Sequence, residues 1–143
     1  MQKMEESLHS IGINAKIPIR IAFTDSNNDP AVISLWYVYM NGKIFCATQK
    51  ASKIVSYLKN NPICGFEIAA DLPPYKGVRG KGIARVLEDK GTKVLSILID
   101  KYLERKESKL SQFLQNNSKT EVAIEITPKR IFSYDYSQRM DGA

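Results

Sequence analysis

The sequence predicts a mainly β protein, an antiparallel β-barrel with a few helices packed outside it. Segments rich in β-branched and aromatic residues follow one another with tight turns between them, and only a few segments have helical spacing. Consecutive strands joined by tight turns favour an antiparallel barrel over a doubly wound parallel sheet. The length of 143 residues fits one domain. We therefore expect a single domain over residues 1–143, with its core at about 17–136.

The first half of this barrel is predicted from alternation and turn chemistry. Residues 17–23 alternate as a half-buried strand does, and residues 25–30 form a turn-rich loop. Residues 32–40, dense in β-branched and aromatic side chains, are predicted to form the first arm of a hairpin. Asn41-Gly42 is the preferred pair for a type I′ turn, and residues 43–48 supply the returning strand.

A short helix and two further strands are expected next. The helix covers residues 52–60 and stops before Pro62, because the residue before a proline disfavours helical geometry. Residues 63–69 return to a strand. A loop rich in proline and glycine follows over residues 73–82. Another strand is predicted over residues 82–88.

The last third combines two helices with a divided strand. Residues 92–106 place apolar side chains at helical spacing, which predicts an amphipathic helix, and residues 108–116 predict a further short helix. Residues 121–126 alternate as a strand up to a break at Pro128, and residues 131–136 continue as a strand after it.

Composition and charge narrow the function classes. Hydrophobic residues make up 43% and charged residues 25%, which is typical of globular proteins and excludes a disordered or fibrous chain. The net charge of +6 is compatible with an anionic partner such as a nucleotide, a phosphorylated metabolite or a nucleic acid. However, the basic residues are scattered, often beside Glu as in residues 101–107, so they favour a solvated helix face over a nucleic-acid arm.

Cysteine usage and hydropathy exclude a zinc site and a membrane span. Cys46 and Cys64 lie in apolar strand-like segments, and His9 is the lone histidine, so a typical Cys/His zinc site cannot be assembled and buried free thiols are expected. No apolar run approaches the roughly 20 residues that span a bilayer. Residues 1–10 mix Lys and Glu, unlike a signal peptide, so a cytoplasmic location is expected.

A candidate phosphate site lies where the hairpin runs into the short helix. A helix start offers unpaired backbone N–H groups and the positive end of the helix dipole, Ser52 adds a hydroxyl and Lys53 adds a point charge. A dianionic phosphate would be well satisfied there. The alternative is that Ser52 only caps the helix, with Lys50 and Lys53 as solvated surface charges.

The order and types of these residues resemble the FMN-binding split barrel family, whose best-known member is pyridoxamine 5′-phosphate oxidase. The resemblance covers about residues 17–136. Four motifs carry it: ISLWYV at 33–38, IFCAT at 44–48 followed by Ser52-Lys53, LKNNP at 58–62 and GVRGKG at 77–82. The family implies a homodimer with flavin mononucleotide (FMN) in clefts between the subunits.

The resemblance also implies which residues hold the cofactor. The phosphate would be held by hydroxyl and basic residues after the second hairpin strand, which are Thr48, Ser52 and Lys53. Main-chain groups of residues 34–36 and 46–48 would lie along the edge of the isoalloxazine ring. These two segments contain Ser34, Leu35, Trp36, Cys46, Ala47 and Thr48. For Trp36, the alternative is a core or dimer-interface aromatic.

The glycine-rich segment 77–82 has two interpretations. Its G-x-x-G-x-G order matches neither a dinucleotide fingerprint nor a P-loop, and a strand follows where those motifs require a helix. In the family this segment enters a strand beside the flavin, so Lys76 and Arg79 become candidates for contacts to the ring's polar edge or to the phosphate. The alternative is a turn whose glycines permit positive φ, with Arg79 paired to a surface carboxylate.

The end of the sequence bears on the substrate. Residues 133–140 reach the partner subunit's flavin in one interpretation and form an edge strand with a frayed tail in the other. The vitamin B6 oxidase carries an Arg-rich signature with a histidine at its C-terminus, and this segment has no histidine. The sequence therefore does not support that oxidase activity itself.

The leading functional hypothesis is an FMN-dependent oxidoreductase in which flavin N5 accepts or donates hydride. No catalytic acid or base can be identified. A reductase that uses the deazaflavin F420 is one alternative, and a non-catalytic flavin carrier or sensor is another. A remoter alternative is a barrel that binds single-stranded nucleic acid by stacking on Tyr37, Tyr39 and Phe45, although the basic residues do not gather around them.

Overall fold

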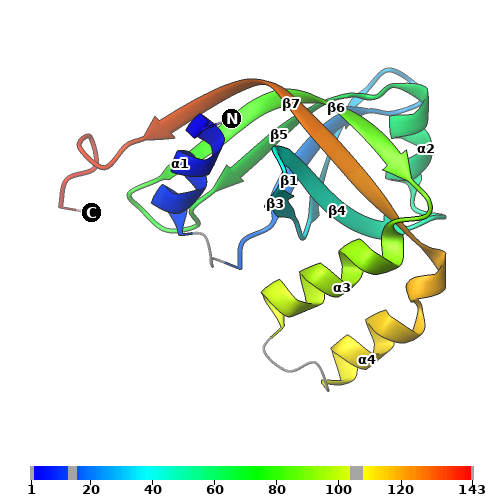
Figure 1. The fold of residues 1–143 in the computed structure, drawn as a ribbon. Helices are drawn as coiled ribbons and strands as arrows, with labels where there is room; N and C mark the ends of the chain where they lie inside the picture. Colours follow the sequence, from blue (N-terminus) through cyan, green and yellow to red (C-terminus); the bar gives the residue numbers. More distant parts are fainter. Residues whose placement is uncertain (1, 13–15, 104–107, 143) are drawn as a thin grey trace.

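A computed structural model describes residues 2–12, 16–103 and 108–142 of the chain (Figure 1). The strands are β1 Ile19–Thr24, β2 Pro30–Leu35, β3 Val38–Met40, β4 Lys43–Gln49, β5 Ile63–Ala69, β6 Lys76–Leu87 and β7 Glu121–Asp135. The helices are α1 Gln2–Ile11, α2 Lys53–Asn60, α3 Gly91–Tyr102 and α4 Lys109–Asn116, followed by the short 3₁₀ helix Ser118–Thr120.

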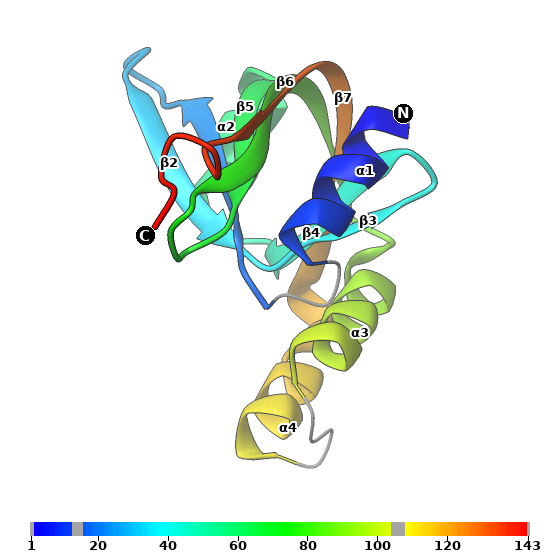
Figure 2. The same ribbon diagram turned by 90° about the vertical axis from the view of Figure 1, so that its left-hand side faces the viewer.

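The seven strands form one antiparallel sheet in the order β2-β1-β5-β6-β7-β4-β3. Strands β2 and β3 are consecutive in the chain but lie at opposite edges, so the sheet curls round without closing (Figures 1 and 2). Its interior is apolar, with side chains such as Ile21, Ile44 and Ile124 fully buried. The predicted antiparallel split barrel is confirmed, with helices outside it.

The prediction of one strand over residues 32–40 is wrong. The chain leaves the sheet at Trp36 and Tyr37. Before this crossover β2 pairs with β1, and after it β3 pairs with β4 through Val38 opposite Phe45. The whole segment is apolar on both sides of the crossover, so its composition does not reveal the change of partner. The tight turn is confirmed, because Asn41 and Gly42 have φ values of 54° and 77°.

The prediction of a loop over residues 73–82 is wrong in its second half, because β6 begins at Lys76. None of the glycines in this strand has a positive φ, which also excludes the turn alternative. Gly80 instead allows close packing. A Cβ there would lie 2.3 Å from the carbonyl oxygen of Arg130 and 2.8 Å from the ring of Phe66.

The predicted break at Pro128 is also wrong, because β7 is one continuous strand. Lys81 pairs with Arg130 whereas the next residue, Gly82, pairs with Pro128, so Lys129 is an extra residue on β7. This is a β-bulge, which leaves one residue of the ladder unpaired. A proline, which has no N–H to donate, is tolerated at such a position.

Two helix predictions are confirmed closely and one only in part. Helix α2 starts after Ser52 as its N-cap, and α4 starts after Ser108. Helix α3 ends at Tyr102, because Leu103 already has extended geometry. The remainder of the predicted helix, residues 104–106, lies outside the described residues. No helix among the described residues is long and apolar enough to cross a membrane.

Helix α1 was not predicted from the sequence. Met4 and Leu8 are buried in the main core, and Ile11 packs against it. Their spacing of four and three residues places them on one helical face, and this pattern was the available signal. Helix α1 packs against β6 and β7. Cys46 and Cys64 are buried free thiols as expected, and burial raises the pKa of Cys64 to about 11.

Candidate functional site

The end of β4 and the start of α2 form a corner with unused polar groups. The backbone N–H of Ser52 donates to Gln49 O at 2.9 Å, which fixes the turn between the two elements. Ser52 is the N-cap residue of α2, but its side chain makes no capping hydrogen bond, so its hydroxyl is not used in capping. The exposed side chain of Lys53 is what the alternative of a solvated surface charge expects. The first N–H groups of a helix have no intrahelical partner. This corner therefore offers hydroxyl and N–H donors to a ligand.

The positive charge of Lys53 is not neutralised by an ion pair with any carboxylate in the described ranges. Its side chain is exposed at the first position of α2. The neighbouring Lys50 lies 3.8 Å from Glu88, and Lys59 lies 2.9 Å from the same carboxylate. The hydrogen bond from Lys59, with help from Lys50, holds the pKa of Glu88 below its usual value. Lys53 is therefore the cation of this corner best suited to meet an anion.

Two strand edges have unpaired main-chain groups, one on β4 at this corner and one on β2 at the opposite edge of the sheet. The β3·β4 ladder ends at Val38 opposite Phe45, so β4 beyond Phe45 pairs only with β7. Strand β2 is the edge of the sheet and pairs only with β1. Backbone N–H and C=O groups along these open edges can bond a ligand. They belong to segments 34–36 and 46–48, to which the resemblance assigns the isoalloxazine ring.

The side chains of these two segments are less available than their backbones. The Trp36 ring stacks on Tyr102 with centroids 4.9 Å apart and planes at 4°, and Ala47 packs against the same cluster under α3. This supports the alternative of Trp36 as a core aromatic. Cys46 is fully buried, Leu35 and Thr48 are partly buried, and Ser34 is exposed.

Lys76 and Arg79 do not join this corner within one chain. Thr48 pairs with Val122, and the next residue of β7, Ala123, pairs with Leu87 at the far end of β6. Arg79 precedes Leu87 by eight residues, which corresponds to roughly 26 Å along the strand. The sequence therefore indicated the corner residues and the β6 residues Lys76 and Arg79, but it did not indicate that the two groups lie apart.

Arg79 lies in a cluster of its own on the outer face of the sheet. Its Nε is 3.6 Å from Glu67 Oε2, and the guanidinium lies 4.4 Å from the ring centroid of Tyr134. The Tyr134 hydroxyl donates to Glu67 Oε2 at 2.9 Å. The predicted alternative of an ion pair between Arg79 and a surface carboxylate is confirmed.

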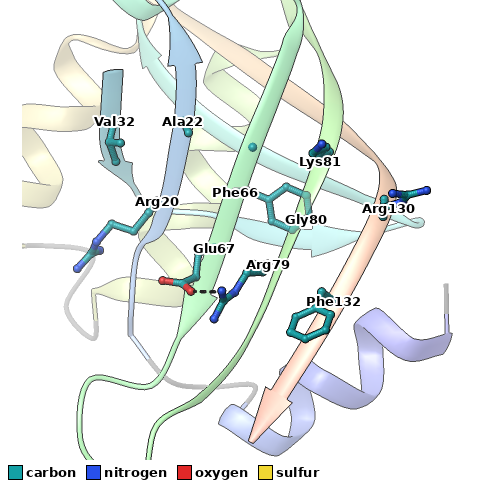
Figure 3. Close-up of a pocket in the computed structure, with 11 residues that line it drawn as sticks. Arg20, Ala22, Val32, Phe66, Glu67, Arg79, Gly80, Lys81, Arg130 and Phe132 are labelled. Atoms are coloured by element: carbon teal, nitrogen blue, oxygen red, sulfur yellow. Dashed lines mark ion pairs between the residues drawn. The ribbon is translucent and has the colours of Figure 1, made fainter. Parts of the chain in front are cut away.

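An open pocket of about 470 Å³ lies on this face, and Glu67 and Arg79 are part of its lining (Figure 3). Its floor includes Phe66, Gly65 and Gly80, and Arg20, Lys81 and Arg130 add positive charge around it. Val32 and Phe132 are 68% and 58% exposed on the same face. Sequence reasoning missed these residues, because they come from five strands whose order in the sheet is not visible in the sequence.

Comparison with known proteins identifies the family. A family model described as pyridoxamine 5′-phosphate oxidase matches residues 8–133. No curated protein matches. Solved structures do, including a conserved hypothetical protein from Mycobacterium tuberculosis at 19% identity, which has a TM-score of 0.73 and an alignment that covers 89% of this chain and 82% of that one.

Two further solved structures differ in the ligands that their names state. A protein named F420 reductase has 14% identity and a TM-score of 0.68, with 83% of this chain and 91% of that chain covered. A heme storage protein from Vibrio cholerae has 13% identity and a TM-score of 0.68, with 90% and 93% covered. At such identities the likeness shows a shared fold alone.

Proposed function

The chain belongs to the pyridoxamine 5′-phosphate oxidase family, and from this premise we propose that it binds FMN and acts as a flavin-dependent oxidoreductase. The observation that carries the proposal is the corner between β4 and α2. There an exposed Lys53 without an ion pair in the described structure and a non-capping Ser52 hydroxyl meet the open edge of β4. A phosphate group fits this donor set, because a helix start with added hydroxyl and ammonium groups suits a dianion.

The chain's own residues would bind and orient the cofactor. Ser52, Lys53 and Thr48 would hold the phosphate, and the unpaired main-chain groups of β2 and β4 would hold the polar edge of the ring. Bound FMN supplies hydride transfer at its N5. The packing of Trp36 and Ala47 under α3 keeps these edges rigid, because both side chains are held in an apolar cluster.

A homodimer completes the proposal. Arg79 and Lys76 lie too far along β6 to reach the corner of their own chain, so contacts from them to the same flavin would have to come from a second copy. The outer face with Val32 and Phe132 exposes apolar side chains that a partner would cover. Both features support an assembly in which each flavin touches two subunits.

The alternatives differ in the cofactor or in turnover. F420 also needs a basic phosphate pocket, and one structural neighbour is named F420 reductase. A flavin carrier would share the cofactor residues but would not turn over with a reduced nicotinamide. Nucleic-acid stacking has less support, because Tyr37 is buried and Phe45 packs under α3.

The first test is an absorbance spectrum of the purified chain after reconstitution with FMN and desalting. We expect flavin bands at close to one cofactor per chain. Retention of F420 but not FMN would favour the reductase alternative, and retention of neither would contradict flavin binding. Reduction assays with nicotinamide donors then separate an oxidoreductase from a carrier.

The variant Lys53→Glu tests the phosphate corner directly. It should weaken FMN binding roughly 10- to 100-fold, because a hydrogen bond to a charged group contributes about 1.5–3 kcal/mol. FMN fluorescence quenching measures the affinity. The matched control is Lys109→Glu, at another exposed lysine at the start of a helix, α4, and it should bind FMN normally. Equal affinity of Lys53→Glu and the control would reject the role of Lys53.

A further inference from the structure

A second cavity, of about 420 Å³, lies between α1, β3 and the end of α3. Leu8 and His9 of α1, Tyr39 and Met40 of β3, and Lys101 of α3 contribute to its lining. Its volume is within the range of small-molecule sites. None of these five residues belongs to the predicted flavin site, so the cavity is a separate candidate binding site.

Lys101 brings a partly dehydrated cation to this cavity. Its Nζ donates to Tyr37 O at 2.7 Å and lies 3.6 Å from the Tyr37 ring centroid and 4.8 Å from that of Tyr102. It forms no ion pair with a carboxylate of the described chain. Burial lowers the pKa of Lys101 to about 8. An ammonium has three N–H donors, and the single bond to Tyr37 leaves two for a ligand.

Tyr39 contributes a second unsatisfied polar group. Its ring lines the cavity, and its hydroxyl is enclosed with no hydrogen-bond partner in the described structure. Most buried hydroxyls have such a partner. A ligand oxygen would provide one once the side chain swings about its Cα–Cβ bond towards the cavity, because the hydroxyl is enclosed where it lies.

We propose that this cavity binds a small organic monocarboxylate with an apolar body. The carboxylate would accept from Lys101 Nζ and Tyr39 Oη, and Leu8 and Met40 would contact the apolar body. Glu5, exposed on α1, also lines the cavity. After burial, its charge is the second cause of the raised pKa of the Tyr39 hydroxyl. It opposes every negative group on the ligand, so a monoanion is disfavoured less than a dianion such as a phosphate.

Benzoate is a suitable probe, and benzamide is its neutral match in size. Trp36 is the only tryptophan of the chain and stacks on Tyr102 beside Lys101, so its fluorescence reports on this region. Titration of the full-length chain should show saturable binding of benzoate, with benzamide about tenfold weaker or worse because it lacks the charge. Calorimetric titration provides an independent affinity.

Two variants and one control assign the site. Lys101→Met keeps the apolar stem, removes the charge and should weaken benzoate binding about tenfold or more. Tyr39→Phe deletes only the unpaired hydroxyl, so it should weaken binding while leaving the melting temperature unchanged or higher. Lys93→Met, at an exposed lysine of the same helix, should bind benzoate as the unmodified chain does.

Each contrary outcome overturns the proposal. Absence of saturable benzoate binding would do so, as would equal affinity for benzamide or undiminished binding by both Lys101→Met and Tyr39→Phe. If Lys101→Met does not fold, Tyr39→Phe alone decides between binding and its absence, because phenylalanine has almost the same packing volume as tyrosine.

Discussion

At the scale of single residues, Lys101 couples the stability of the fold to pH. Its folded pKa of about 8 lies below the ordinary 10.5 because burial disfavours the charged form. The unfolded chain therefore binds this proton more tightly, and folding stability should rise as pH increases through 8 towards 10.5. At pH 7 the amine is protonated, so the folded state bears the full free-energy cost of burying its charge.

Lys101→Met should abolish this pH dependence. The stability of the unmodified chain relative to Lys101→Met is expected to rise by about 1 kcal/mol between pH 7 and 9.5, a value reduced to allow for the partial exposure of the amine. Urea unfolding at both pH values measures it, with Lys93→Met as the control. If the stability difference between the unmodified chain and Lys101→Met were independent of pH, burial would not lower the pKa of Lys101.

The positions of individual candidate residues were predictable where local sequence determines their environment. Ser52 and Lys53 follow from the strand and helix signals around them, and their positions at the start of α2 are confirmed. The partners of Arg79 were not predictable by name, because Glu67 and Tyr134 come from β5 and β7. Lys101 was not singled out from the sequence, because on a helical wheel it resembles any solvated lysine and only the contact with Tyr37 distinguishes it.

At the scale of elements, we expect Gly80 of β6 to matter because it has no side chain to clash with its neighbours, and not because its backbone needs a positive φ. Gly80→Ala should destabilise the fold by about 1–3 kcal/mol, because its Cβ would meet the Arg130 carbonyl and the Phe66 ring. Gly65→Ala on β5 is the matched control. There the nearest atom to a new Cβ is 3.6 Å away, and the cost should be below about 1 kcal/mol. Chemical denaturation of both variants compares them, and equal stability would contradict this role of Gly80.

Elements defined by local signals were predicted well, and those defined by partners were not. Strand β5 matches its predicted bounds, and α2 and the Asn41-Gly42 turn match closely. The crossover between β2 and β3 went unseen, because both flanks are equally apolar and only the pairing separates them. Pro128 suggested a break because proline cannot donate to a ladder, but the bulge opposite Lys81 and Gly82 accommodates it.

At the scale of the whole molecule, the barrel class followed from the succession of strands and turns, whereas its open edges depend on long-range pairing. Those edges and the distance between Arg79 and Lys53 are the basis for the proposed dimer. Light scattering should give the mass of two chains, and a monomer that binds FMN tightly would contradict a shared site.

Mixing two defective variants tests the sharing of the site more directly. Lys53→Glu and Arg79→Ala should each bind FMN poorly alone. Refolded together in equal amounts, half of the dimers would be hybrids with one intact site each, so about a quarter of all sites should regain FMN. No recovery after mixing would mean that the two residues do not serve one flavin from opposite subunits.

The pairing of β4 with β7 also affects the order in which the molecule assembles. Gln49 lies opposite Glu121, so more than seventy residues must be looped before this ladder forms, whereas β1 with β2 and β3 with β4 are joined by short turns. Loop closure over that length is entropically costly and slows folding. The edge of β4 at the corner next to Ser52 therefore finds its partner strand late in folding, and only after β7 has been synthesised.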